Sequence, residues 1–193
     1  MMWLTFVAVV IVSFASLIFM RPVAEKIGLV DKPNFRKRHQ GLIPLIGGIA
    51  LFLGNLTYYA FQYDTMPLPG LYLLSVTILL VIGVLDDRFD ISPALRAGIQ
   101  AVLAGAMIYS GLELESLGQI IAPFSIKLGF FSLLFTVFIT IGVINAFNMV
   151  DGIDGLLAGL SSVSFAGIGA LMWINGEHAI AYWCLAIILT LIP

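Results

Sequence analysis

The sequence predicts an all-α protein, a polytopic bundle of transmembrane helices, and three observations lead to this prediction. Hydrophobic residues make up 61% of the 193 residues and charged residues only 10%, whereas soluble domains have about 45–50% and about 25%. The apolar residues gather in long runs separated by short polar segments. The basic residues fall almost entirely on one side of these runs when successive runs cross a bilayer in alternate directions.

Each apolar run reaches or approaches the length of about 20 residues that a helix needs to cross a bilayer. The runs cover residues 3–20, 44–61, 70–85, 94–110, 124–147, 156–174 and 179–193. The shorter runs would borrow interfacial residues or thin the bilayer locally. Sheets are not expected, because the runs are too long and lack period-two alternation. We therefore expect about seven spans in a single transmembrane domain over residues 1–193.

The segments that bound the runs carry their own signals. No basic residue precedes the first run and no small-residue cleavage site follows it, so we expect a retained span rather than a secretory signal. Ser92 and Pro93 are typical of an N-cap followed by proline at the first helical position, which predicts a helix start there. The last run stops at Pro193 without a polar tail, which suggests the N-terminal part of a longer protein.

The distribution of charges predicts the topology. Eight of the nine basic residues fall on one side, namely Arg21, Lys26, Lys32, Arg36, Lys37, Arg38, Arg88 and Arg96. Only Lys127 falls on the other side. Because cytoplasmic loops carry the excess of Lys and Arg, the basic side is expected to be cytoplasmic. Five aspartates fall on the same side: Asp86, Asp87, Asp90, Asp151 and Asp154.

The first chemical motif is the aspartate pair Asp86–Asp87, which directly follows an apolar run. Two like charges this close repel unless a cation lies between them. Mg²⁺ prefers oxygen ligands and suits a site that also holds phosphates. The alternative interpretation is a charged helix end anchored at the interface, with Arg88 as the counter-ion.

The second motif is a polar segment at the end of the fifth run. Four side chains recur at intervals of three residues: Asn145, Asn148, Asp151 and Asp154. On a helix each step drifts by about 60°, so the four would form a turning ridge rather than one face. Gly152 and Gly155 indicate that the helix ends here, and exposed N–H groups at the next helix start suit a phosphate or a uracil edge. A polar interfacial turn with glycines for close packing is the alternative.

The third motif is the basic segment Arg36-Lys37-Arg38-His39, which leads into Pro44 and the pair Gly47–Gly48. Arginine binds phosphate bidentately and lysine acts as a point charge. An anchor on anionic lipid head groups would need the same residues. For His39 we expect hydrogen-bond donation to a phosphate rather than proton transfer.

Taken together, residues 30–44, 85–92 and 145–155 closely resemble the polyprenyl-phosphate N-acetylhexosamine-1-phosphate transferase superfamily, and the resemblance spans essentially the whole chain. It implies transfer of N-acetylglucosamine 1-phosphate from UDP-GlcNAc to undecaprenyl phosphate with release of UMP. This reaction would occur at the cytoplasmic face of the bacterial inner membrane. It would start the synthesis of enterobacterial common antigen and O-antigen lipopolysaccharide.

The resemblance also implies roles for individual residues. Asp86 and Asp87 match the catalytic aspartate pair of the superfamily. The residues expected to bind nucleotide sugar or phosphate are Asn148, Asp151, Gly152, Asp154, Arg38 and His39. The residues expected to hold the metal, Mg²⁺ or alternatively Mn²⁺, are Asp86, Asp87 and Asp151. Whether one aspartate acts as a base stays open, although a phosphate monoester with a second pKa near 6 needs little help to ionise.

Two features of the superfamily are absent from these 193 residues: a later Met-Gly-Asp segment and a His-rich cytoplasmic loop. Its members have ten or eleven spans, so the chain is expected to be inactive alone. A related donor such as UDP-MurNAc-pentapeptide is the first alternative. A transporter is a distant one, because the acids lie at run ends and no repeat halves occur. The partners expected are the two substrates and the lipid bilayer, without nucleic acid; the oligomeric state is left open.

Overall fold

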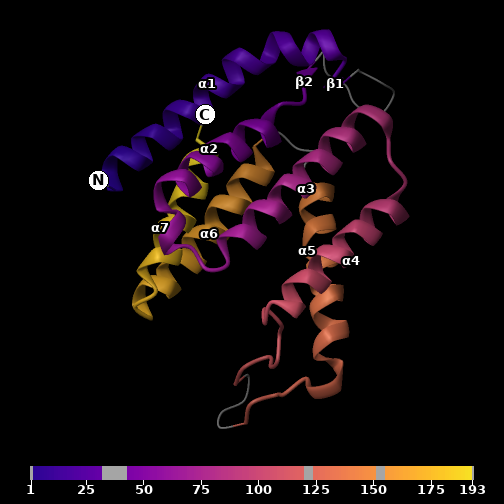
Figure 1. Ribbon diagram of the computed structural model, residues 1–193, viewed down its shortest axis with the longest axis vertical. Helices are drawn as coiled ribbons and strands as arrows, with labels where there is room; N and C mark the ends of the chain where they lie inside the picture. The colour runs from indigo at the N-terminus through magenta and orange to yellow at the C-terminus, as the bar shows by residue number, and fades with distance from the viewer. Residues whose placement is uncertain (1, 32–42, 120–123, 151–154, 193) are drawn as a thin grey trace. The chain divides into compact units, whose positions relative to one another are not determined.

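The computed structural model describes residues 2–31, 43–119, 124–150 and 155–192, and within them the fold is helical (Figure 1). The α-helices are α1 Met2–Ile27, α2 Gly47–Gln62, α3 Pro69–Phe89, α4 Pro93–Tyr109, α5 Ser132–Val150, α6 Leu156–Ile174 and α7 His178–Thr190. The short elements are strands β1 Val30–Asp31 and β2 Ile43–Pro44, with 3₁₀ turns η1 Tyr63–Thr65 and η2 Gly129–Phe131. Every apolar run contains one helix, and the all-α fold class is confirmed.

The helices differ in their capacity to cross a bilayer. By length and composition α1, α3, α5 together with η2, and α6 are long and apolar enough. Helices α2, α4 and α7 are shorter, so their crossing stays a prediction. Large apolar side chains point outward, as at Val102 and Val163, which each expose 73% of their surface. Outward apolar faces suit lipid rather than water, and the chain is a multi-pass membrane protein.

Two helices run further than their apolar runs predict. Helix α1 continues to Ile27, and its added turns carry an ion pair in which Arg21 Nε lies 3.6 Å from Glu25 Oε1. Helix α3 continues to Phe89, where Asp90 adopts the left-handed conformation and donates its N–H to the Asp86 carbonyl at 2.8 Å. Asparagine and aspartate tolerate this conformation better than other side chains. The polar residues that end an apolar run therefore still belong to the helix.

The fifth run was predicted wrongly at its start. The helix begins only at Ser132, because the residues before it pair with an earlier segment of the chain. Leu128 donates its N–H to the Glu115 carbonyl at 2.8 Å, while the Ser132 hydroxyl donates to the Leu114 carbonyl at 2.8 Å. The first bond occupies a backbone N–H that an earlier helix start would use, and the second holds Ser132 against the earlier segment. The strands β1 and β2 also depart from the expectation of no sheet, with Val30 opposite Pro44 and Asp31 opposite Ile43.

The chain divides into two compact units, of which the first comprises residues 1–90 and 158–193. In this unit α1, α2 and α7 pack together at a seam of small residues, Ser13, Gly54 and Thr190. A β-carbon on Gly54 would overlap both the Ser13 hydroxyl and the Thr190 methyl group. The Ser13 hydroxyl donates to the Ala50 carbonyl at 3.3 Å. Small side chains at such seams let membrane helices approach closely.

Aromatic rings cluster beyond this seam, toward the first residues of α1. Phe6 stacks on Tyr58 with 6.4 Å between ring centroids, and the rings of Trp183 and Tyr72 form a T-shaped pair with 4.8 Å between centroids. In the predicted topology this end of the unit faces outward, where aromatic belts of membrane proteins lie. The second unit, residues 91–157, is built on α4 and α5. The Ser92 hydroxyl accepts the Leu95 N–H at 3.3 Å, as expected of the N-cap of α4.

Candidate functional site

The aspartate pair lies in the last turn of α3 rather than in the loop after it. Asp86 is half-buried and Asp87 is exposed. The C-terminal end of a helix carries partial negative charge from its free carbonyls, so carboxylates there are unfavourable without a cation. The position thus adds a second reason, besides mutual repulsion, for a cation at this turn. Arg88 in the same turn supplies one positive charge.

Arg88 links the acidic turn to the end of α1. Its guanidinium donates a hydrogen bond to the carbonyl of Ile27, the last residue of α1, and also lies 5.2 Å from the centroid of the Phe89 ring. A carbonyl at a helix C-terminus has no partner within its own helix, which makes it a suitable acceptor. The sequence suggested Arg88 only as a counter-ion, and this anchoring role was missed.

The ribbon of β1 and β2 contacts α3. Leu45 donates its N–H to the Leu29 carbonyl at 3.1 Å, and Gly47 and Gly48 then open helix α2. The segment from Pro44 to the pair Gly47–Gly48 therefore leads directly from the ribbon into a helix start. Arg38 and His39 belong to residues 32–42, which lie outside the described residues, so their roles stay predictions.

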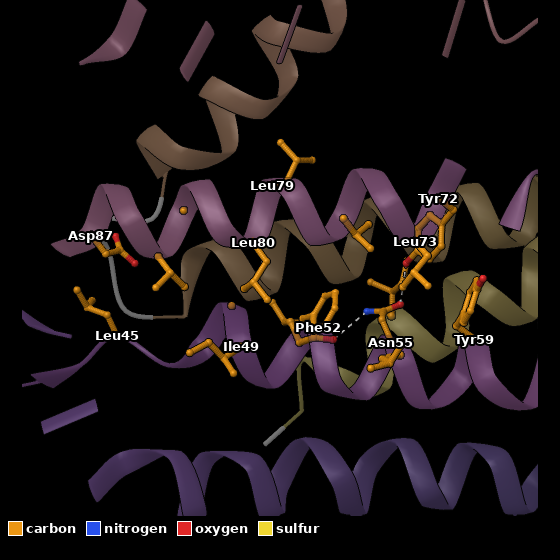
Figure 2. A pocket seen from close by; sticks show the side chains of 17 residues that line it. Leu45, Ile49, Phe52, Asn55, Tyr59, Tyr72, Leu73, Leu79, Leu80 and Asp87 are labelled. Atoms are coloured by element: carbon orange, nitrogen blue, oxygen red, sulfur yellow. Dashed lines mark hydrogen bonds between the residues drawn. The ribbon is translucent and has the colours of Figure 1, made fainter. Parts of the chain in front are cut away.

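An apolar groove runs between α2 and α3 and reaches the acidic turn (Figure 2). Its volume is about 380 Å³. Asp87 and Leu45 lie at one end, and Tyr59 and Tyr72 lie at the other. The sequence analysis did not find this groove, because its existence depends on which faces of the two helices meet. The spacing of its lining residues on each helix was the available signal.

In the second unit, the two asparagines of α5 differ in their surroundings, as their spacing of three residues predicts. Asn145 is half-buried and donates from Nδ2 to Gln100 Oε1 of α4 at 2.9 Å and to the Ile141 carbonyl at 2.8 Å. Asn148, one step of three further on, is exposed. Gln100 was also missed, although an isolated amide in an apolar run usually signals a hydrogen-bonded partner.

The break in the helix at this segment is confirmed. Helix α5 ends at Val150, and α6 begins at Leu156 after Gly155, whose φ is +74°. The predicted site residues Asp151, Gly152 and Asp154 lie outside the described residues. The meeting of the five aspartates at one centre therefore stays a prediction, as does the third metal ligand.

The described residues that could hold a metal ion are few. Within residues 2–31, 43–119, 124–150 and 155–192, no three His, Cys, Asp or Glu side chains gather closely enough to bind one. The pair Asp86–Asp87 still offers hard oxygen ligands on a single turn. This donor set fits Mg²⁺, which proteins usually bind through one or two carboxylates plus phosphate oxygens and water.

An outward apolar surface, an acidic helix end and an adjoining apolar groove together define a membrane-embedded protein with a charged site at the lipid boundary. The chain belongs to glycosyl transferase family 4, whose family model matches residues 70–193. The matched region contains both the aspartate pair and the Asn145–Gly155 segment.

Similar curated proteins carry one common name, undecaprenyl-phosphate alpha-N-acetylglucosaminyl 1-phosphate transferase. The protein from Haemophilus influenzae is 59% identical over 94% of this chain and 51% of its own length. The protein from Pasteurella multocida is 58% identical over all of this chain and 54% of its own length, and that from Escherichia coli K12 is 52% identical over 92% and 48%. The chain thus spans about half the length of these relatives. No solved structure matches it significantly.

Proposed function

We propose that this protein transfers N-acetylglucosamine 1-phosphate from UDP-GlcNAc to undecaprenyl phosphate at the cytoplasmic face of the bacterial inner membrane. The observation that carries the proposal is the aspartate pair at the negative end of a membrane helix. The names of relatives at 52–59% identity support the donor and the acceptor. The product would start enterobacterial common antigen and O-antigen lipopolysaccharide synthesis.

In the proposed reaction an oxygen of the lipid phosphate attacks the β-phosphorus of UDP-GlcNAc. The bond between that phosphorus and the oxygen bridging to the α-phosphate breaks, and UMP leaves. A phosphate monoester has its second pKa near 6, so the nucleophile is largely dianionic at neutral pH. A protein base is therefore not required, which favours a binding and positioning role for both aspartates.

Asp86 and Asp87 would hold Mg²⁺, or alternatively Mn²⁺, with Asp151 as a third ligand. A bound divalent ion supplies charge neutralisation for the diphosphate as phosphoryl transfer proceeds. Asn148, Asp154 and the Gly152 backbone would bind the nucleotide sugar. Arg38 and His39 would donate hydrogen bonds to phosphate oxygens.

The proposal is tested with the full-length protein in membranes that contain undecaprenyl phosphate. Labelled UDP-GlcNAc should give a labelled lipid product and UMP, and EDTA should abolish the reaction until Mg²⁺ is returned. UDP-MurNAc-pentapeptide serves as the competing donor, because a related transferase could use it. Efficient transfer from that donor, or UDP-GlcNAc transfer that resists chelation, would contradict the proposed substrate or the proposed metal.

A further inference from the structure

The buried face of α4, the helix that packs against α5, contains one amide side chain. The buried residues of α4 are Gln100, Leu103 and Ala104, at intervals that place them on one side of the helix. Gln100 exposes only 6% of its surface. An amide buried among membrane helices costs free energy unless it is hydrogen-bonded, and a methionine would fill a similar space without this cost. The bond to α5 is therefore what the amide group of Gln100 adds.

Apolar packing alone does not fix the rotation of α5 about its own axis. Hydrophobic residues surround this helix almost evenly, and lipid is as apolar as they are, so no hydrophobic force selects one face. Polar bonds hold α5 at two levels instead. Near its start Thr136 Oγ1 accepts the Leu114 N–H at 2.9 Å, and nine residues further on Asn145 donates to Gln100 at 2.9 Å. Gln100 thus holds the end of α5 that leads to the proposed site.

The side chain of Asn148 depends on this rotation, because it belongs to the last turn of α5. Asn148 follows Asn145 by three residues, which is about 4.5 Å along the axis and about 60° short of a full turn. It is exposed, and we propose above that it binds the nucleotide sugar. A rotation of α5 by about 30° would move an atom 5–6 Å from the axis by about 3 Å, which is more than a hydrogen bond tolerates.

We propose that Gln100 is a positioning residue for the donor substrate. By accepting from Asn145 it fixes the rotation of α5, and so the direction from which Asn148 meets the nucleotide sugar. Gln100 acts through α5 and not on the substrate, because it is buried. The inference rests on the proposed function for the identity of the donor.

Loss of this bond should lower the affinity for the donor rather than the rate at saturation. When only a fraction of the protein holds the binding-competent rotation, the apparent Kd rises as that fraction falls, and a saturating ligand restores the competent state. A hydrogen bond between membrane helices changes an equilibrium constant about threefold on average and at most about eighteenfold. We therefore expect KM for UDP-GlcNAc to rise about threefold to tenfold, with kcat changed less than about twofold.

Three variants separate positioning from stability. Gln100→Met removes the accepting oxygen with little change in side-chain length. The exchanged pair Gln100→Asn with Asn145→Gln keeps both amides and the number of methylene groups between the helices. Thr136→Val is the matched control, because it has nearly the same shape, removes a buried polar bond from the other end of α5 and leaves the Gln100–Asn145 bond in place.

The first measurement uses the full-length protein in nanodiscs that contain undecaprenyl phosphate. KM for UDP-GlcNAc should rise about threefold to tenfold in Gln100→Met, change less than about twofold in Thr136→Val and recover in the exchanged pair. In an Asn148→Ala background Gln100→Met should change KM less than about twofold, because the residue that Gln100 positions is gone.

Two results of this measurement would overturn the proposal. A lower kcat at unchanged KM in Gln100→Met would mean fewer folded molecules rather than a misplaced binding residue. An equal rise of KM in Thr136→Val would mean that any loss of stability in α5 has the same effect.

The second measurement does not need turnover. A nitroxide attached at Asn148→Cys, in protein whose other cysteines are replaced, reports how firmly the end of α5 is held. Gln100→Met should add a second component of different mobility to the electron paramagnetic resonance spectrum, and Thr136→Val should not. An unchanged spectrum in Gln100→Met would overturn the proposal. If the spectrum changes but UDP-GlcNAc donates to no acceptor, the control of α5 by Gln100 stands and the proposed function fails.

Discussion

The two faces of α2 pack in opposite ways. One face meets α1 and α7 so closely that Gly54 leaves no room for a β-carbon beside Ser13 and Thr190. The other face meets α3 across a groove of about 380 Å³, where a β-carbon on Gly83 would meet open space and one on Gly48 would only touch the Leu80 side chain at 4.0 Å. Glycine therefore allows close helix packing on one face of α2 and leaves unfilled space on the other. The closed face therefore contributes packing that stabilises the unit, whereas the open face leaves a groove beside the acidic turn.

The largest effect is expected at the charged end of the open face. Asp87→Asn should lower the transfer rate at least about 100-fold if Asp87 is the metal ligand that we propose, because loss of such a ligand costs several kcal/mol of transition-state stabilisation. The same change should leave the protein equally stable, or stabilise it by about 0.3–1 kcal/mol, because it removes a negative charge from a helix C-terminus. Product formation and thermal unfolding in detergent measure the two effects.

Asp64→Asn, in the turn η1, is the control and should change neither quantity. The pH dependence of the matching variant Asp86→Asn separates a metal ligand from a base. Activity that recovers at high pH would point to a base and would contradict the metal-binding role.

The second largest effect tests the closed face. Gly54→Ala should destabilise the protein by about 1–3 kcal/mol, because the added methyl group overlaps two side chains in a packed seam. Gly83→Ala, on the open face, should be neutral or stabilising by up to about 1 kcal/mol, because alanine restricts the unfolded chain more than glycine does. Thermal unfolding of the two variants gives the comparison directly. Equal destabilisation would remove the distinction between the faces.

A third, smaller effect concerns the second unit, which has an interhelical hydrogen bond in place of a glycine seam. Gln100, only 6% exposed, accepts from Asn145 at 2.9 Å. Such bonds between membrane helices average about 0.6 kcal/mol and reach about 1.7 kcal/mol. A double-mutant cycle with Gln100→Leu and Asn145→Leu should give a coupling energy in this range. Additive single effects would mean that the bond does not fix α4 against α5.

The smallest effect is expected at the end of the groove that Tyr72 and Asn55 line. Tyr72→Phe removes the hydroxyl that donates to Asn55 but keeps the ring that packs against Trp183. The loss should be about 0.5–1 kcal/mol, the usual contribution of one neutral hydrogen bond. Tyr109→Phe, at a residue that is 94% exposed, should change stability less. A larger loss of stability in Tyr72→Phe would show that this end of the groove also contributes to the stabilising packing of the unit.

The helices could be predicted from the sequence because apolar runs of this length leave few other structures in a bilayer. Several of their ends could not, since these depend on hydrogen bonds that the apolar pattern does not show. The start of α5 at Ser132 and the extension of α3 through Asp86 and Asp87 are set by such bonds. An apolar run predicts which residues face lipid, but it does not predict the residue at which the helix ends.

Some features of the candidate site could likewise be predicted from the sequence, and others could not. The aspartate pair and the helix break after Asn148 followed from residue types and spacing alone. The groove and the Gln100–Asn145 bond required knowledge of which helix faces meet, and one sequence does not contain this information. The contact of Arg88 with Ile27 joins residues 61 positions apart, and no local sequence pattern predicts it.

The length of α1 has a consequence for where the chemistry takes place. At about 1.5 Å per residue its 26 residues extend about 39 Å, beyond a hydrocarbon core of about 30 Å. Its last turns thus reach the head-group layer, and the Ile27 carbonyl there tethers Arg88 of the neighbouring helix end. The aspartates beside it would then lie at the height where water is present, so in the proposed reaction the ionised phosphates would meet there while the prenyl tail of the acceptor stays in the hydrocarbon core.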